Sequence, residues 1–161
     1  MSSRVFEASD IVEIAVRIEE NGSNFYKYAE QIAKQEEAKN LFSQLAAAEI
    51  AHKKIFESLF AQIEKYNPPE NYAGEYDAYL RDYVDNNIIF TKEAMDKELS
   101  QVKDTAAALD FAIKREMDSI LYYHEIKRFV PVAQHLIIDQ IIDEERKHFS
   151  QLSEAKKKYC A

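Results

Sequence analysis

Two pairs of residues in this chain combine a carboxylate with an imidazole three positions later, a spacing found among metal ligands on a helix. The pairs are Glu49 with His52 and Glu145 with His148. Positions three apart lie on one helix face, so each pair can direct two ligand atoms to the same place. Both pairs interrupt stripes of apolar residues that repeat every three or four positions. We therefore expect these polar side chains to be buried.

Two further glutamates, Glu19 and Glu116, interrupt apolar stripes elsewhere in the chain. Four ionised carboxylates inside one core need a proton, a basic partner or a metal ion to compensate their charge. No lysine or arginine is expected at the centre of these stripes near the same level, so we predict that metal supplies the compensation. Two divalent ions would balance four glutamates if both histidines are neutral.

Four long helical patterns must position these residues. The periodicity predicts helices over about 9–34, 36–66 and 105–128, and a fourth that starts near Pro131. Ser9 or Asp10 is expected to cap the first helix, and Asn67-Pro68-Pro69 to end the second. With only two glycines and three prolines in 161 residues, long uninterrupted elements are expected.

The connection between the second and third helices, residues 67–104, is long and rich in tyrosine. A connection of this length is expected to contain structure of its own, and residues 88–99 have a helical pattern. We predict an all-α fold in a single domain over residues 1–161. Its architecture is a ferritin-like four-helix bundle of two antiparallel hairpins, joined by a long, partly helical crossover.

The chain positions of the glutamates place them at one level of this bundle. Glu19 and Glu49 are equally far from the first hairpin turn, as Glu116 and Glu145 are from the second. The two halves repeat, because Glu116 follows Glu19 by 97 residues and Glu145 follows Glu49 by 96. A tyrosine lies seven residues after each single glutamate, and we expect Tyr26 and Tyr123 to hydrogen-bond ligating carboxylates.

One glutamate from each of two helices, with Glu-x-x-His from each of the other two, is the pattern of di-iron and di-manganese carboxylate proteins. We therefore predict a two-metal site, most consistent with iron and also compatible with manganese or zinc. The predicted ligands are Glu19, Glu49, His52, Glu116, Glu145 and His148.

Four segments, which are spread over nearly the whole chain, resemble the helices of the rubrerythrin family. They are residues 18–26, 41–52, 116–123 and 143–148. The resemblance implies a non-haem di-iron site that reduces hydrogen peroxide, or reacts with oxygen, with electrons from a partner. This chain lacks the four cysteines of a rubredoxin domain, so a separate donor such as a rubredoxin-like protein is expected. It also has Ser119 where rubrerythrins have a second glutamate, so the six-residue set resembles bacterioferritin more closely.

Two other functions remain open at this point. One is a ferroxidase or iron-binding ferritin-like protein, and the other is a structural bundle whose metal site is vestigial or filled by zinc. A symmetric homodimer is the ordinary expectation for the assembly. Glu20, Glu144, His124 and His135 are interpreted as surface or packing residues.

The composition excludes several other classes of function. The net charge of −8 argues against nucleic acid as a partner, since phosphate binding needs a basic surface. No apolar run is long enough to span a membrane, and the N-terminus does not resemble a signal peptide, so we expect a cytoplasmic protein. The single cysteine, Cys160, cannot form an intramolecular disulfide and is interpreted as an exposed thiol.

Overall fold

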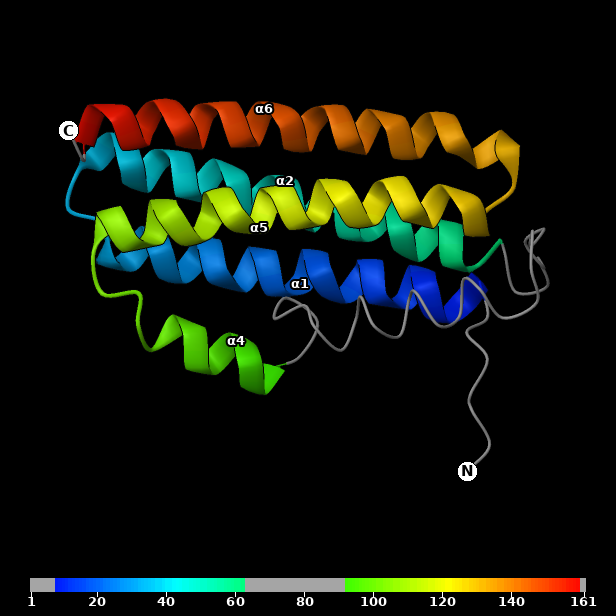
Figure 1. Cartoon of the computed structure of the whole chain (residues 1–161), viewed down its shortest axis with the longest axis horizontal. Coiled ribbons are helices and arrows are strands. Elements are labelled where there is room, and N and C mark those ends of the chain that lie inside the picture. The colour runs from blue at the N-terminus through cyan, green and yellow to red at the C-terminus, as the bar shows by residue number, and fades with distance from the viewer. Residues whose placement is uncertain (1–7, 63–91, 160–161) are drawn as a thin grey trace.

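The computed structural model describes residues 8–62 and 92–159, and every regular element in those ranges is helical. Four long helices lie along a common direction (Figure 1). They are α1 (Ala8–Ile32), α2 (Glu36–Phe60), α5 (Thr105–Ile126) and α6 (His135–Tyr159). The shorter elements are α4 (Lys92–Leu99) and the 3-10 turns η2 (Lys127–Phe129) and η3 (Val132–Gln134). The predicted all-α bundle is confirmed.

The four long helices form two antiparallel hairpins. Helix α1 packs along α2, and α5 packs along α6. The hairpins meet through contacts of α1 with α5 and of α2 with α6. Helix α4, which lies within the predicted helical segment 88–99, packs against α1 (Figure 1). The tyrosines of the crossover, Tyr72, Tyr76, Tyr79 and Tyr83, and Cys160 lie outside the described residues.

Some predicted helix ends differ from those observed. Helix α1 begins at Ala8, so Ser9 and Asp10 lie within its first turn and do not precede it as caps. Helix α6 begins at His135, four residues after Pro131. Pro131 has an extended ψ of 145°, which places it before the 3-10 turn that leads into the helix. Helix α2 ends at Phe60, about six residues before the end predicted from Asn67-Pro68-Pro69, and those three residues lie outside the described ranges.

The apolar core of the bundle is divided into two clusters. One contains Ile18, Phe56, Tyr123 and Ile141, and the other contains residues about two to three turns away on the same helices. Members of the second cluster include Phe25, Leu45, Ala112 and Leu152. Between the two clusters lies a layer of buried polar side chains contributed by all four long helices. The two clusters therefore hold the helices together on both sides of that layer.

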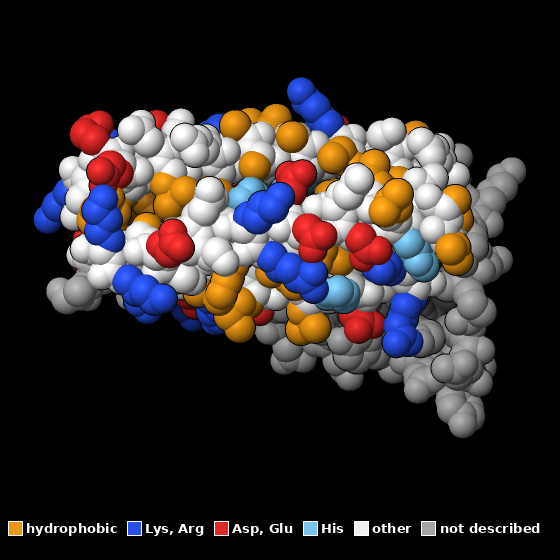
Figure 2. All heavy atoms as spheres, turned by 90° about the horizontal axis from the view of Figure 1, so that it is seen from above, with side chains coloured by type: hydrophobic (Ala, Val, Ile, Leu, Met, Phe, Trp, Pro, Cys, Tyr) orange, Lys and Arg blue, Asp and Glu red, His pale blue; other side chains and the backbone are white. Residues whose placement is uncertain are grey.

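The outer surface of the bundle is typical of solvated helices. On the face shown in Figure 2, acidic and basic side chains are interspersed and do not form a patch of a single sign. Within the two described ranges, no helix has the length and apolar character needed to cross a bilayer.

Helix α5, which carries Glu116, is capped at its N-terminus by Asp104, whose Oδ1 accepts a hydrogen bond from the Ala107 amide at 2.8 Å. We predict that Asp104→Ala lowers the free energy of unfolding of the metal-free protein by about 1 kcal/mol, because a helix N–H loses its acceptor. Urea denaturation measures the change. Asp104→Asn is the matched control, since it keeps an acceptor oxygen; an equal loss in both variants would contradict the capping role.

Candidate metal centre

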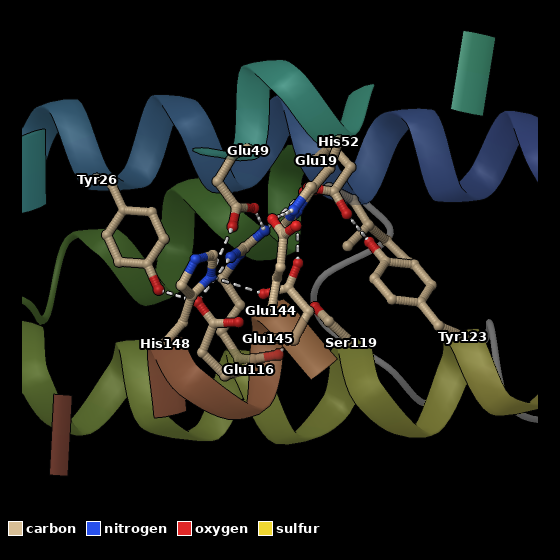
Figure 3. Close-up of polar contacts among 12 residues, drawn as sticks. Glu19, Tyr26, Glu49, His52, Glu116, Ser119, Tyr123, Glu144, Glu145 and His148 are labelled. Atoms are coloured by element: carbon tan, nitrogen blue, oxygen red, sulfur yellow. Dashed lines mark hydrogen bonds and ion pairs between the residues drawn. The ribbon is translucent and has the colours of Figure 1, made fainter. Parts of the chain in front are cut away.

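The four long helices bring the six predicted ligands into one buried cluster (Figure 3). The cluster consists of two overlapping groups. One contains Glu19, Glu49, His52 and Glu145, and the other contains Glu49, Glu116, Glu145 and His148. Within each group, one potential ligand atom of every residue lies within 4.8 Å of the others. Glu49 and Glu145 belong to both groups, so the two groups share two carboxylates.

Both histidines direct Nδ1 toward the carboxylates. His52 Nδ1 lies 2.8 Å from Glu145 Oε1 and 3.6 Å from Glu19 Oε2. His148 Nδ1 lies 3.0 Å from Glu145 Oε2 and 4.0 Å from Glu49 Oε1. Each imidazole therefore presents the same nitrogen to the centre of the cluster, as a pair of matched metal ligands requires.

The outer nitrogen of His52 has a carboxylate partner of its own. His52 Nε2 lies 2.8 Å from Glu144 Oε2. When Nε2 donates its proton to this carboxylate, Nδ1 keeps a lone pair for a metal ion. Glu144 is exposed, as expected from the sequence, and its 53% exposed side chain makes this contact from the rim of the cluster. Its partner lies on another helix, so the periodicity of α6 alone carries no signal for this contact.

The unpaired atoms of the cluster show that its residues fit a metal site. One oxygen of each glutamate, and Nδ1 of His52, have no hydrogen bond to any described residue. Although His52 Nδ1 is close to Glu145 Oε1, the two atoms are not oriented as donor and acceptor. Leaving buried carboxylate oxygens without compensation is costly, and carboxylate oxygen with imidazole nitrogen suits iron, manganese or zinc.

Two buried tyrosines hold the single glutamates from across the bundle. The Tyr26 hydroxyl on α1 donates to Glu116 Oε1 on α5, and the Tyr123 hydroxyl on α5 donates to Glu19 Oε1 on α1. Figure 3 shows the two rings on opposite sides of the cluster. Because α1 and α5 run in opposite directions, the two tyrosines lie on opposite sides of the cluster, and each hydroxyl reaches back to the glutamate of the other helix. The hydrogen bonds expected from the sequence are present, and each one joins the two hairpins.

A buried arginine lies beside the cluster, which corrects the expectation that no basic residue would reach this level. Arg115 Nη2 donates to Glu49 Oε2 at 2.9 Å and to the Ile18 carbonyl at 2.7 Å. Its burial could be predicted from the sequence. One buried face of α5 repeats every three or four positions, at Ala108, Ala112, Arg115, Ser119 and Tyr122. Arginine was overlooked because it is so seldom fully buried. With two divalent ions the cluster would therefore carry one excess positive charge.

Gly22 provides the space for this arginine. A Cβ atom on Gly22 would overlap Arg115 Nη2 and Glu49 Oε2. The absence of a side chain at Gly22 therefore leaves room for a guanidinium and a carboxylate. At the corresponding position of the second half, the Ser119 hydroxyl donates to the Arg115 carbonyl at 3.0 Å.

Burial governs the titration of the glutamates. Burial raises the pKa of Glu49 well above its ordinary value, although Arg115 lowers it. The pKa of Glu116 is also raised well above its ordinary value, first by burial and then by the charge of Glu145. Burial likewise raises the pKa of Glu19. Without metal, these carboxylates thus have an increased affinity for protons, which a bound cation would have to displace.

The two histidines titrate differently. Burial lowers the pKa of His52, but its contacts with Glu145 and Glu19 outweigh burial and raise that pKa to about 12. Burial is the main effect on His148, and its pKa is lowered. The two imidazoles therefore have opposite pKa shifts, although they occupy corresponding positions on α2 and α6.

The remaining histidines lie outside the cluster. His124 is exposed and lies 3.4 Å from Arg146 Nη2, and half-buried His135 contacts the Val130 carbonyl at 3.2 Å. Glu20, next to Glu19 in sequence, is exposed and pairs with Lys53 at 3.0 Å. These positions agree with the surface and packing roles expected from the sequence.

Comparisons with known proteins agree with this geometry. The family model described as Rubrerythrin matches residues 10–156. A crystal structure from Thermotoga maritima, of a protein described as a candidate ferritin-like diiron-carboxylate protein, is similar with a TM-score of 0.66 and 26% sequence identity. The similarity covers 96% of this chain and 97% of that one. No curated protein matches the sequence. Since the family model covers nearly the whole chain and its four helices carry the expected glutamates and histidines, the chain belongs to the rubrerythrin family.

Proposed function

We propose that this chain binds two iron ions and reduces hydrogen peroxide or oxygen with electrons from a separate donor. The observation that carries the proposal is the pair of four-residue groups that share Glu49 and Glu145. One ion would be held by Glu19, His52 and the two shared glutamates, and the other by Glu116, His148 and the same two glutamates. Each position would thus have three carboxylates and one imidazole.

The chemistry needs electrons that the protein side chains do not supply. When bound at this cluster, two ferrous ions would supply the two electrons that, with two protons, convert hydrogen peroxide into two molecules of water, and would become ferric. The 161 residues contain a single cysteine, so the four-cysteine iron site of a rubredoxin cannot be built from them. This supports a donor outside these 161 residues.

The protein's own residues orient and enclose the reacting centre. The Tyr26 and Tyr123 hydroxyls each hold one oxygen of a single glutamate, which leaves the other oxygen free to face a metal ion. Burial raises the pKa of both tyrosines well above the ordinary value, so each hydroxyl keeps its proton at neutral pH. The apolar clusters on either side exclude water from the ends of the polar layer.

Metal content and peroxide reactivity test the proposal together. Protein purified without oxygen should bind two ferrous ions per chain. One equivalent of hydrogen peroxide should oxidise both ions to the ferric state, and absorbance measures this oxidation. Glu49→Ala combined with Glu145→Ala should abolish stoichiometric binding, because both groups lose their shared carboxylates.

Glu20→Ala is the control, since it removes an exposed glutamate adjacent to Glu19. Two ions retained at full affinity by the double variant would refute the ligand assignment. Zinc in place of iron would favour a structural bundle. Uptake of iron far beyond two ions per chain would favour iron storage.

Metal affinity should weaken as pH falls. His52, whose pKa is raised to about 12 without metal, must lose its Nδ1 proton before Nδ1 can bind an ion. Each proton released on binding lowers the apparent affinity by about tenfold for every unit by which pH decreases. Calorimetry in buffers of different ionisation enthalpy counts the protons released. Affinity that is constant between about pH 6 and pH 8 would contradict this coupling.

Tyr26→Phe should leave metal content close to that of the wild type but change the rate of oxidation by peroxide by about tenfold. The expected size reflects a hydrogen bond to a charged group, which is worth roughly 1.5–3 kcal/mol. Stopped-flow absorbance measures the rate. Tyr28→Phe is the control, because the Tyr28 hydroxyl donates to the Val102 carbonyl, away from the cluster. Complete loss of metal in Tyr26→Phe would mean that the tyrosine is needed to form the site.

A further inference from the structure

Arg115 breaks the two-fold character of the cluster. The repeat of 97 residues that relates Glu19 to Glu116 also relates Ile18 to Arg115. The residue before the single glutamate is therefore apolar in the first half of the chain and cationic in the second. The ligand types are matched in the two halves, so this position introduces a charge difference beside one group, while Glu144 contacts His52 of the other group.

The contacts of Arg115 favour one of the two groups. Its guanidinium lies 2.9 Å from Glu49 Oε2, and Nη1 lies 3.9 Å from Glu116 Oε1. Both of these glutamates belong to the group that contains His148, whereas only Glu49 belongs to the group that contains His52. Among the described residues, Glu19 has no ion pair with a lysine or arginine.

The structure provides space for this guanidinium, but burying it lowers the stability of the fold. Gly22 leaves the space that Arg115 and Glu49 occupy, and the Ile18 carbonyl accepts a hydrogen bond from Nη2. Nevertheless, Nε and Nη1 have no hydrogen bond to any described residue, and the side chain is almost completely buried. Unpaired buried donors destabilise a fold, so the stability of the core does not by itself explain an arginine here.

We propose that Arg115 makes the two metal positions unequal, so that the ion held with His148 binds more weakly than the ion held with His52. This inference rests on the proposed two-metal function. An ion at the His148 position must share Glu49 and Glu116 with a permanent cation that lies against both. An ion at the His52 position shares only Glu49 with that cation and has Glu19 to itself.

The charge of the cluster supports ordered filling. Four carboxylates and one guanidinium carry a net charge of −3 when both histidines are neutral. The first divalent ion reduces this charge to −1, and the second makes it +1. The second ion enters the position nearest the guanidinium. Repulsion between Arg115 and this ion therefore lowers its binding affinity more than that of the first ion.

Anaerobic titration with cobalt(II), followed by visible absorbance and calorimetry, tests the inference on the whole chain. The wild type should bind two ions with dissociation constants that differ by about tenfold or more, as expected for one nearby charge in a partly buried site. His148→Ala should retain the tight ion, and His52→Ala should retain only the weak ion. Two equal constants, or a tight ion that survives in His52→Ala and not in His148→Ala, would overturn the inference.

Variants of Arg115 identify the cause of the difference. Arg115→Met removes the charge and should tighten the weaker ion by about tenfold or more, with a smaller effect on the tighter ion. Arg115→Lys retains a cation and should keep the two constants apart, which a role in packing alone would not predict. An unchanged ratio in Arg115→Met would overturn the assignment to Arg115. If Arg115→Met does not fold, the two histidine variants still decide the order of filling.

Failure of this inference can be distinguished from failure of the proposed function. Two cobalt ions that bind equally would refute only the inequality, and the two-metal site would stand. No stoichiometric binding of cobalt or ferrous ion would refute the metal site itself, and the inference would fall with it.

Discussion

The burial of four carboxylates in the middle of an apolar bundle is the constraint on which the rest of this structure depends. Glu19, Glu49, Glu116 and Glu145 are each almost fully buried, and each has one oxygen without a hydrogen bond to any described residue. Ionised groups in such surroundings are stable only beside compensating charge. The surrounding residues supply part of that compensation, and the oxygens that remain unpaired are those available to metal ions.

The partial compensation comes from residues on α1, α2 and α5. Arg115 neutralises one carboxylate through its contact with Glu49, and the contacts of His52 with Glu145 and Glu19 raise its pKa and so favour its charged form. The two tyrosine hydroxyls add hydrogen bonds that cross from one hairpin to the other. The same side chains thus position the ligands and join the hairpins, so the geometry of the site and the packing of the bundle are fixed together. The apolar clusters on both sides hold the helices at this spacing.

Most of the fold and of the cluster could be predicted because helical spacing and the distances to the hairpin turns indicate the same positions. Helical spacing placed Glu49 with His52, and Glu145 with His148, on inner faces, and the equal distances to the hairpin turns placed all four glutamates at one level. Arg115 follows the same spacing and was missed because residue type was weighed above position. Glu144 could not be found in this way, since its contact with His52 depends on how α2 and α6 pack. The start of α6 was displaced by the extended backbone of Pro131, a local conformation that the periodicity does not encode.

The internal repeat explains why a single residue can have a large effect on this site. In a fully two-fold cluster, both metal positions would have the same charge environment and would fill with the same intrinsic affinity. The ligand types and the two tyrosines are matched in the two halves, but Arg115 replaces the apolar Ile18 of the other half and lies against the carboxylates of one position, and Glu144 contacts the His52 imidazole of the other. Gly22 then becomes necessary on the facing helix, because any larger side chain would occupy the space of the guanidinium. The departure from symmetry is therefore built from a matched pair of residues on α1 and α5, which ties the charge difference to the packing of the two hairpins.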